Sequence, residues 1–176
     1  MFATILLPNF YLQAITRHQP RLREQPLAVL DASAIKAVIL QLNDHALSAG
    51  VRPGMTPSQA LGRCLHLVIK ARARAQEIQV SDILLHHAFI LSPLVEATGP
   101  GMCTVQFMGE TELKKKTERV VELLSRCHLT AHVGIAQNPD ASFLAAQLAN
   151  PVLHINETEQ FLAPLRIETL AIEAVT

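Results

Sequence analysis

The sequence predicts an α+β fold, and three observations indicate it. Hydrophobic residues make up 49% of the 176 residues and charged residues only 17%, which is enough apolar material for a packed core. Short apolar runs alternate with longer stretches of helical periodicity along the chain. Their order, β-α-β-β-α-α-β followed by α-β-β-α-β-α-β, is typical of helices packed on a mixed sheet.

The first half begins with a strand and a helix and continues with shorter elements. The apolar run 3–7 predicts the strand, and the helix begins at Phe10. Asn43 and Thr56 each precede a short helix that they can cap, and Gln59 stands at the capping-box position after Thr56. Further short apolar runs predict strands at residues 27–30, 35–40 and 67–69.

The second half is more regular and fits a ferredoxin-like layer of helices on a sheet. A long helical pattern covers residues 71–91, with Ile78, Leu84 and Ala88 expected on its buried face. The clearest amphipathic helix covers residues 110–127. The remaining elements are predicted strands at 94–97, 103–107, 130–136 and 152–155, and predicted helices at 139–149 and 157–162.

Composition and charge exclude several classes of protein. Lysine and arginine balance aspartate and glutamate at 15 each, so a nucleic-acid contact would have to come from a local basic patch. No apolar run reaches the roughly 18 residues of a membrane span, and the first residues lack the basic region of a signal peptide, so a cytoplasmic protein without a membrane partner is expected. The three cysteines are widely spaced and are expected to be free thiols.

Two clusters of cations are candidates for contact with DNA phosphates. Each has an alternative interpretation as a solvated helix face, which is the commoner role of such clusters. The candidate residues are Lys70, Arg72 and Arg74 in "KARARA", and Lys114, Lys115 and Lys116 in "LKKKTER". The histidines are not spaced as metal ligands, and no nucleophile motif or dinucleotide-binding loop occurs. The residues alone therefore predict no catalytic constellation, metal or cofactor.

Three stretches taken together resemble the Y-family (UmuC/DinB-type) translesion DNA polymerases. "ALSAGVRPGMTPSQALGRCLHLVI" at 46–69 resembles the fingers segment of that family. "LTAHVGIAQNPDASFLAAQLANP" at 129–151 resembles a segment of its palm, and the opening strand and helix followed by "RLREQPLAVLD" resemble its first palm element. The order of the three matches along the chain is that of the family.

The resemblance implies a domain organisation. Residues 1–10 and 71–166 would form a ferredoxin-like palm, and residues 11–70 a small, mostly helical fingers subdomain with short strands. Residues 167–176 would begin a thumb or a tail, so the chain is expected to be a truncated piece of a longer protein.

The resemblance also implies where catalysis would occur in such a palm. Family members hold two Mg²⁺ ions with an aspartate at the end of the first strand and an Asp-Glu pair in the hairpin after the long helix. These positions fall on Pro8, Gly101 and Met102. The positions that contact the incoming nucleotide fall on Asp44, Leu47 and Asn150. Because Pro8, Gly101 and Met102 have no side-chain oxygen to offer as a ligand for Mg²⁺, we expect a protein that is not an enzyme.

Within the family, "LPNF", "QLNDHALSAGVRPGMTPSQAL" and "SPLVEATGPG" resemble the ImuB-type branch. That resemblance implies a scaffold in error-prone translesion synthesis and damage-induced mutagenesis, with weak DNA binding by this piece. The partners it implies for the full-length family are a DnaE-type polymerase, a RecA/ImuA-like protein and the sliding clamp.

Two other interpretations stay open. One is a protein-interaction module on a palm-like fold without a role in repair. The other is an active nucleotidyltransferase whose carboxylates have moved, with Asp31, Glu96 and Glu110 as the candidates.

Overall fold

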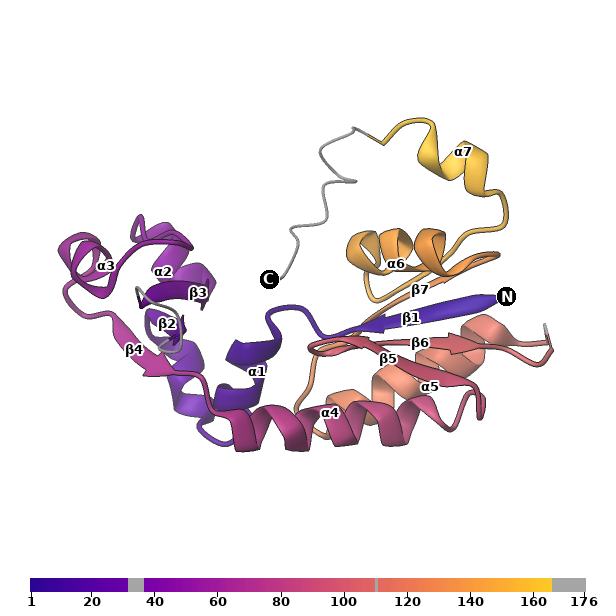
Figure 1. The fold of residues 1–176 in the computed structure, drawn as a ribbon, viewed down its shortest axis with the longest axis horizontal. Helices are drawn as coiled ribbons and strands as arrows, with labels where there is room; N and C mark the ends of the chain where they lie inside the picture. Colours follow the sequence, from indigo (N-terminus) through magenta and orange to yellow (C-terminus); the bar gives the residue numbers. More distant parts are fainter. Residues whose placement is uncertain (32–36, 110, 166–176) are drawn as a thin grey trace. The chain divides into compact units, whose positions relative to one another are not determined.

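A computed structural model describes residues 1–31, 37–109 and 111–165. Packing divides the chain into two compact units (Figure 1). The larger unit contains Met1–Leu7 and the chain from Ile83 onward, and the smaller unit is Pro8–Asp82. In the described ranges, no helix is long and apolar enough to span a membrane.

The larger unit is built on a five-stranded sheet with the order β5-β6-β1-β7-β8. Its strands are β1 (Phe2–Leu6), β5 (Val95–Gly99), β6 (Met102–Gln106), β7 (His132–Ala136) and β8 (Val152–His154). The central strand β1 pairs antiparallel with both β6 and β7, while β8 pairs parallel with β7. The order β5-β6-β1-β7 is that of a split βαβ arrangement, which confirms the predicted ferredoxin-like layer.

The two faces of this sheet carry different helices. Figure 1 shows α6 (Pro139–Leu148) on one face and α5 (Leu113–Arg126) on the other. Successive side chains of a strand point to opposite faces of the sheet. Ala3 and Ile5 of β1 are fully buried on one face, and Thr4 between them forms a hydrogen bond with Ser142 of α6 on the other. On β1, Ala3 and Ile5 therefore lie on the face away from α6, and Thr4 lies on the α6 face, where Ala136 of β7 also packs against Ala141 and Ala145 of α6.

Gly134 in β7 allows α6 to lie directly on the sheet. A Cβ atom at this position would overlap the backbone of α6 at Ser142, Ala145 and Ala146. Any side chain here would push the helix away, so the close packing depends on this glycine.

The smaller unit has a three-stranded sheet with the order β3-β2-β4. Its strands are β2 (Leu27–Asp31), β3 (Val38–Leu42) and β4 (Val68–Ala71), and its helical elements are α1 (Phe10–Thr16), the 3₁₀ turn η1 (Pro20–Glu24), α2 (Asp44–Ser48) and α3 (Pro57–Arg63). The core is small, with Ala28, Ile39, Ala46, Val51, Ala60 and Leu67 buried together. The strand predicted at residues 35–40 corresponds to β3, and its expected start at residue 35 lies outside the described residues.

The predicted caps of the two short helices are confirmed. Asn43 accepts a hydrogen bond from the backbone N–H of Ala46 at the start of α2. Thr56 and Gln59 form a complete capping box at the start of α3. Both signals are local in sequence, which is why the sequence alone could predict them.

The long helix α4 (Arg74–Ala88) differs from its prediction in length and in orientation. It begins after residue 71 because Ala71 is still paired with Leu30 in the parallel ladder between β2 and β4. Its buried face contains Val80, Leu84 and Ala88, whereas Ile78 is 62% exposed, so the prediction that Ile78 is buried was wrong. Residues 80, 84 and 88 repeat every four positions and share one face, from which residue 78 is rotated.

The other helices of the larger unit are close to their predictions. The helix α5 begins at Leu113, and the expected start at Glu110 lies outside the described residues. Asn138 caps α6 through the N–H of Ala141, and the short helix α7 (Thr158–Leu162) follows β8.

Candidate functional site

The end of β1 lies against the turn that joins β5 and β6. Leu7 donates its backbone N–H to the carbonyl oxygen of Gly101 at 2.8 Å. One step earlier, Leu6 is the ladder partner of Met102. Because Pro8 follows Leu7 in the chain, the strand end and the hairpin turn that the resemblance singled out are neighbours.

The side chains at these positions are uncharged. Gly101 is buried and has a φ of +67° in the turn, and Met102 is half-buried. Asn9, before α1, has a φ of 51°, a conformation that asparagine tolerates better than most residues. In the described ranges, no group of three or more His, Cys, Asp or Glu side chains is placed to hold a metal ion. The assignment of Pro8, Gly101 and Met102 to the metal-ligand positions of the family stays a prediction.

The predicted nucleotide-contact positions are divided between the two units. Asp44 and Leu47 are exposed on α2, where Leu47 keeps 44% of its surface accessible. Asn150 is exposed in the loop before β8, and the bond to Pro151 is cis. The roles of these residues also stay predictions.

Arg72 is held by two neighbours within the smaller unit. Its Nε and Nη2 atoms donate to the two carboxylate oxygens of Glu77 at 3.0 and 2.7 Å. Its guanidinium carbon lies 4.3 Å from the centre of the Tyr11 ring. The hydrogen bonds to Glu77 raise the pKa of Arg72. This arrangement links the end of β4 to α1 and α4, a role that the "KARARA" pattern did not predict.

The other candidate cations are more exposed. Lys114 lies 4.0 Å from Glu118, and Lys115 lies 3.3 Å from Glu112. Exposed pairs of this kind contribute little to stability and are readily exchanged for other partners. The remaining candidates make no ion pair with a residue that the structure describes; they are Lys70, Arg74 and Lys116. That all six candidates bind DNA stays a prediction.

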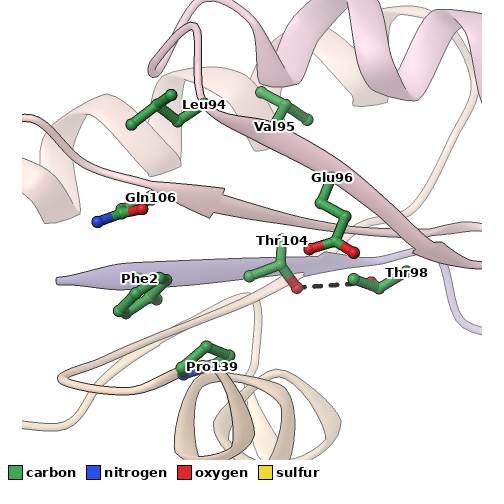
Figure 2. Close-up of a pocket in the computed structure, with 8 residues that line it drawn as sticks. All are labelled: Phe2, Leu94, Val95, Glu96, Thr98, Thr104, Gln106 and Pro139. Carbon is green, nitrogen blue, oxygen red and sulfur yellow. Dashed lines mark hydrogen bonds between the residues drawn. The ribbon is translucent and has the colours of Figure 1, made fainter.

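An open pocket of about 300 Å³ lies on the α6 face of the sheet, over β5, β6 and β1 (Figure 2). Its polar lining is Glu96 and Thr98 of β5 with Thr104 and Gln106 of β6. Its apolar lining is Phe2, Leu94, Val95 and Pro139. Glu96, one of the candidates for a displaced carboxylate, is therefore exposed in this pocket.

Four hydroxyl groups connect the pocket to α6. The Oγ1 atoms of Thr98 and Thr104 are 3.4 Å apart, and those of Thr104 and Thr4 are also 3.4 Å apart. Thr4 Oγ1 lies 2.7 Å from Ser142 Oγ, which donates to the carbonyl oxygen of Pro139 at 2.7 Å. Sequence reasoning missed this series of hydrogen bonds, because residues 4 and 142 are brought together only by the packing of α6 on the sheet.

The model of the impB/mucB/samB family (IMS) matches residues 5–147, which is most of the chain. The chain belongs to this family. The match confirms the Y-family (UmuC/DinB-type) resemblance inferred from the motifs at 46–69 and 129–151.

Curated relatives carry the name DNA polymerase IV. The chain is 27% identical to that of Pectobacterium atrosepticum over 179 residues and 26% identical to that of Pseudomonas putida over 171 residues. Each alignment covers 92% of this chain and 48% of the relative. The chain thus spans about half the length of the curated relatives it matches.

Solved structures have the same fold. The insertion ternary complex of Dbh DNA polymerase matches with a TM-score of 0.83 and 18% identity, over 96% of this chain and 53% of that one. DinB from Sulfolobus solfataricus matches with a TM-score of 0.81 and 18% identity, over 96% and 52%. These likenesses confirm the predicted α+β fold of a Y-family palm and fingers.

The prediction that the protein is not an enzyme is contradicted by these relatives, which are named for an active enzyme, DNA polymerase IV. That prediction took the lack of carboxylates at three positions carried over from the family, Pro8, Gly101 and Met102, as a lack of activity. The hairpin register shifts between Ala97 and Gly99 on the β5 side of the turn, whereas β6 pairs with β1 without a shift.

Proposed function

We propose that this chain supplies the palm and fingers of a Y-family protein that works in error-prone translesion DNA synthesis and damage-induced mutagenesis. In that process we assign it a scaffold role of the ImuB type, in the cytoplasm, where it would contact DNA. The partners would be a DnaE-type polymerase, a RecA/ImuA-like protein and the sliding clamp. The proposal concerns a structural role and is independent of whether the protein also extends primers.

The observation that carries this proposal is the contact between Leu7 and Gly101 at 2.8 Å. It places Leu7, the first residue of "LPNF", beside Gly101, the last residue of "SPLVEATGPG", and these are two of the stretches in which the chain resembles the ImuB-type branch. Contact with DNA is supported by the solved structures with the same fold, one of which is named as a ternary complex and another as a binary complex of a DNA polymerase.

The scaffold role is tested in the source organism with the whole protein. Deleting the gene should lower the frequency of mutations induced by ultraviolet light, and the intact gene should restore it. The tagged whole protein should co-purify with a DnaE-type polymerase after damage. Unchanged induced mutagenesis in the deletion strain would overturn the proposal.

DNA synthesis by the protein itself is a second candidate, which the name of the relatives favours. Primer extension by the whole protein with Mg²⁺ or Mn²⁺ tests it directly. Glu96→Gln examines the displaced-carboxylate interpretation, because amide oxygens are weaker ligands for hard cations than carboxylates. Extension that is lost in this variant and retained in Glu118→Gln, a substitution on the exposed face of α5, would support a role of Glu96 in binding metal.

A further inference from the structure

Beside the pocket in Figure 2, a series of hydrogen bonds joins the hydroxyl groups of Thr98, Thr104, Thr4 and Ser142. The donors in this series can be assigned in only one consistent direction. A carbonyl oxygen can only accept, so the single hydroxyl hydrogen of Ser142 is used on Pro139 at 2.7 Å. Thr4 must then donate to Ser142, and for the same reason Thr104 donates to Thr4. Thr98 in turn donates to Thr104. The two short bonds, from Thr4 to Ser142 and from Ser142 to Pro139, thus point away from the pocket toward α6, and the longer contacts of Thr98 and Thr104 are consistent with the same direction.

This direction determines what the pocket presents to a ligand. The oxygen atoms of Thr98 and Thr104 offer lone pairs, and the carboxylate of Glu96 can only accept. The amide of Gln106 can turn its oxygen to the same side. Among the described residues, the lining contains one carboxylate and no lysine or arginine, so the pocket favours a positively charged hydrogen-bond donor and disfavours an anion.

The remaining walls are apolar and suit a hydrocarbon chain. Phe2 and Pro139 lie on the side of β1 and α6, and Leu94 lies before β5 with 48% of its surface exposed (Figure 2). Methylene groups gain free energy when they leave water for such surfaces. An aromatic ring can also attract a nearby cation through its π face.

We propose that this pocket binds a primary alkylammonium group, with the nitrogen against Glu96, Thr98 and Thr104 and the methylene chain along Phe2, Leu94 and Pro139. Two sources can supply this group, a free diamine or polyamine and the side chain of a lysine on a partner protein. The proposal rests on the larger unit alone and does not depend on the proposed function.

The experiment is calorimetric and NMR titration of the full 176-residue chain at low salt, with 1,5-diaminopentane and with N-acetyl-lysine methylamide as probes. Binding of either probe, with shifted resonances at Thr98 and Thr104, is expected. Binding of the diamine alone assigns the site to small amines, whereas equal binding of the lysine amide assigns it to a partner's lysine. If neither probe binds, the proposal is overturned.

Substitutions at Glu96 and Thr104 test whether these residues bind the alkylammonium group. Glu96→Gln keeps the shape and removes the charge, and it should weaken binding at least tenfold. Thr104→Val removes an acceptor without leaving a buried donor unpaired, and it should weaken binding about tenfold, as expected for a hydrogen bond to a charged group. The matched control is Glu118→Gln, which removes an acid from α5 outside the pocket and should change nothing.

Two further probes could contradict the proposal. 1-Pentanol has the hydrocarbon chain without the charge and is expected to bind far more weakly than the diamine. Inorganic phosphate is not expected to shift the resonances of Thr98 or Thr104. Equal binding of the alcohol, phosphate binding at these threonines, or unchanged diamine binding in Glu96→Gln would each overturn the assignment.

Discussion

At the scale of single residues, Asn43 joins a helix to a strand. Its Oδ1 atom accepts from the N–H groups of Ala46 and Leu27 at 3.1 and 3.0 Å, and its Nδ2 atom donates to the carbonyl oxygen of Gln25 at 2.8 Å. The sequence predicted only the bond to α2. The other two bonds hold the start of β2, so this side chain stabilises the smaller unit at two places.

Replacing Asn43 should therefore cost more than an ordinary helix cap. We expect Asn43→Ala to lower the free energy of unfolding by about 2–3 kcal/mol, because it loses the cap and leaves further backbone groups without partners. Asn43→Asp keeps the two accepting bonds and loses only the donated one, so it should cost about 1 kcal/mol. Urea unfolding measures both, and equal losses in the two variants would contradict the double role.

The free energy of unfolding should also depend on pH through the buried thiol of Cys103. Cys103 on β6 is fully buried, and burial raises the pKa of its thiol from 9.0 to about 12. Because the folded-state pKa is the higher one, the protonated thiol stabilises the fold fully below pH 9, and this contribution is lost as the pH rises from 9 toward 12.

Cys103→Ala should remove this alkaline sensitivity. The variant will be less stable than the wild type at pH 7 because it leaves a small cavity. That difference in the free energy of unfolding should shrink above pH 9, by up to about 1.4 kcal/mol per pH unit. Urea unfolding at pH 7, 9 and 10.5 measures it, and a constant difference would show that the thiol does not titrate with unfolding.

At the scale of elements, the contact between α6 and β7 depends on a missing side chain. Gly134 faces the backbone of α6, whereas Gly62 in α3 has no atom within 4 Å of the place where a Cβ would stand. The two glycines therefore offer a matched pair of substitutions with opposite expected effects.

Gly134→Ala should lower the free energy of unfolding by at least about 3 kcal/mol, because the rigid backbone of α6 has to move. Gly62→Ala should raise it by about 0.5–1 kcal/mol, because alanine loses less freedom in a helix. Thermal and urea unfolding of both variants test the pair. A mild effect of Gly134→Ala would mean that α6 does not lie as close to β7 as the structure places it.

At the scale of the whole molecule, the balanced charge means that any binding of DNA depends on local cations. The two arginines of "KARARA" differ in their surroundings. Arg72 is bonded to Glu77 and stacked on Tyr11, whereas Arg74 is exposed at the start of α4. A phosphate contact made by Arg74 requires no existing ion pair to be broken, so the two residues should respond differently to substitution.

Arg74→Gln and Lys70→Gln should each flatten the log–log dependence of DNA binding on salt by about one unit, the effect of one lost phosphate contact. Arg72→Gln should mainly lower the stability of the chain. Fluorescence anisotropy with a primer–template duplex at several salt concentrations measures the slopes. An unchanged slope in the Lys70/Arg74 double variant would place the DNA contacts elsewhere.

The sequence by itself determined what depends on near neighbours and on periodicity. The capping box at Thr56 and Gln59, the amphipathic face of α5 and the alternation of strands and helices were all predictable, because each depends on residues within a few positions of one another. The family motifs at 46–69 and 129–151 were also readable, since they are continuous stretches of chain.

Only the tertiary structure decided which distant residues meet. Ile78 was misplaced because the packing of α4, and not its composition, selects the buried face. Arg72 became a partner of Glu77, and Thr4 became a partner of Ser142, 138 residues away. Such contacts follow from strand register and helix placement, which are set by the burial of the whole core and leave no local signal in the sequence.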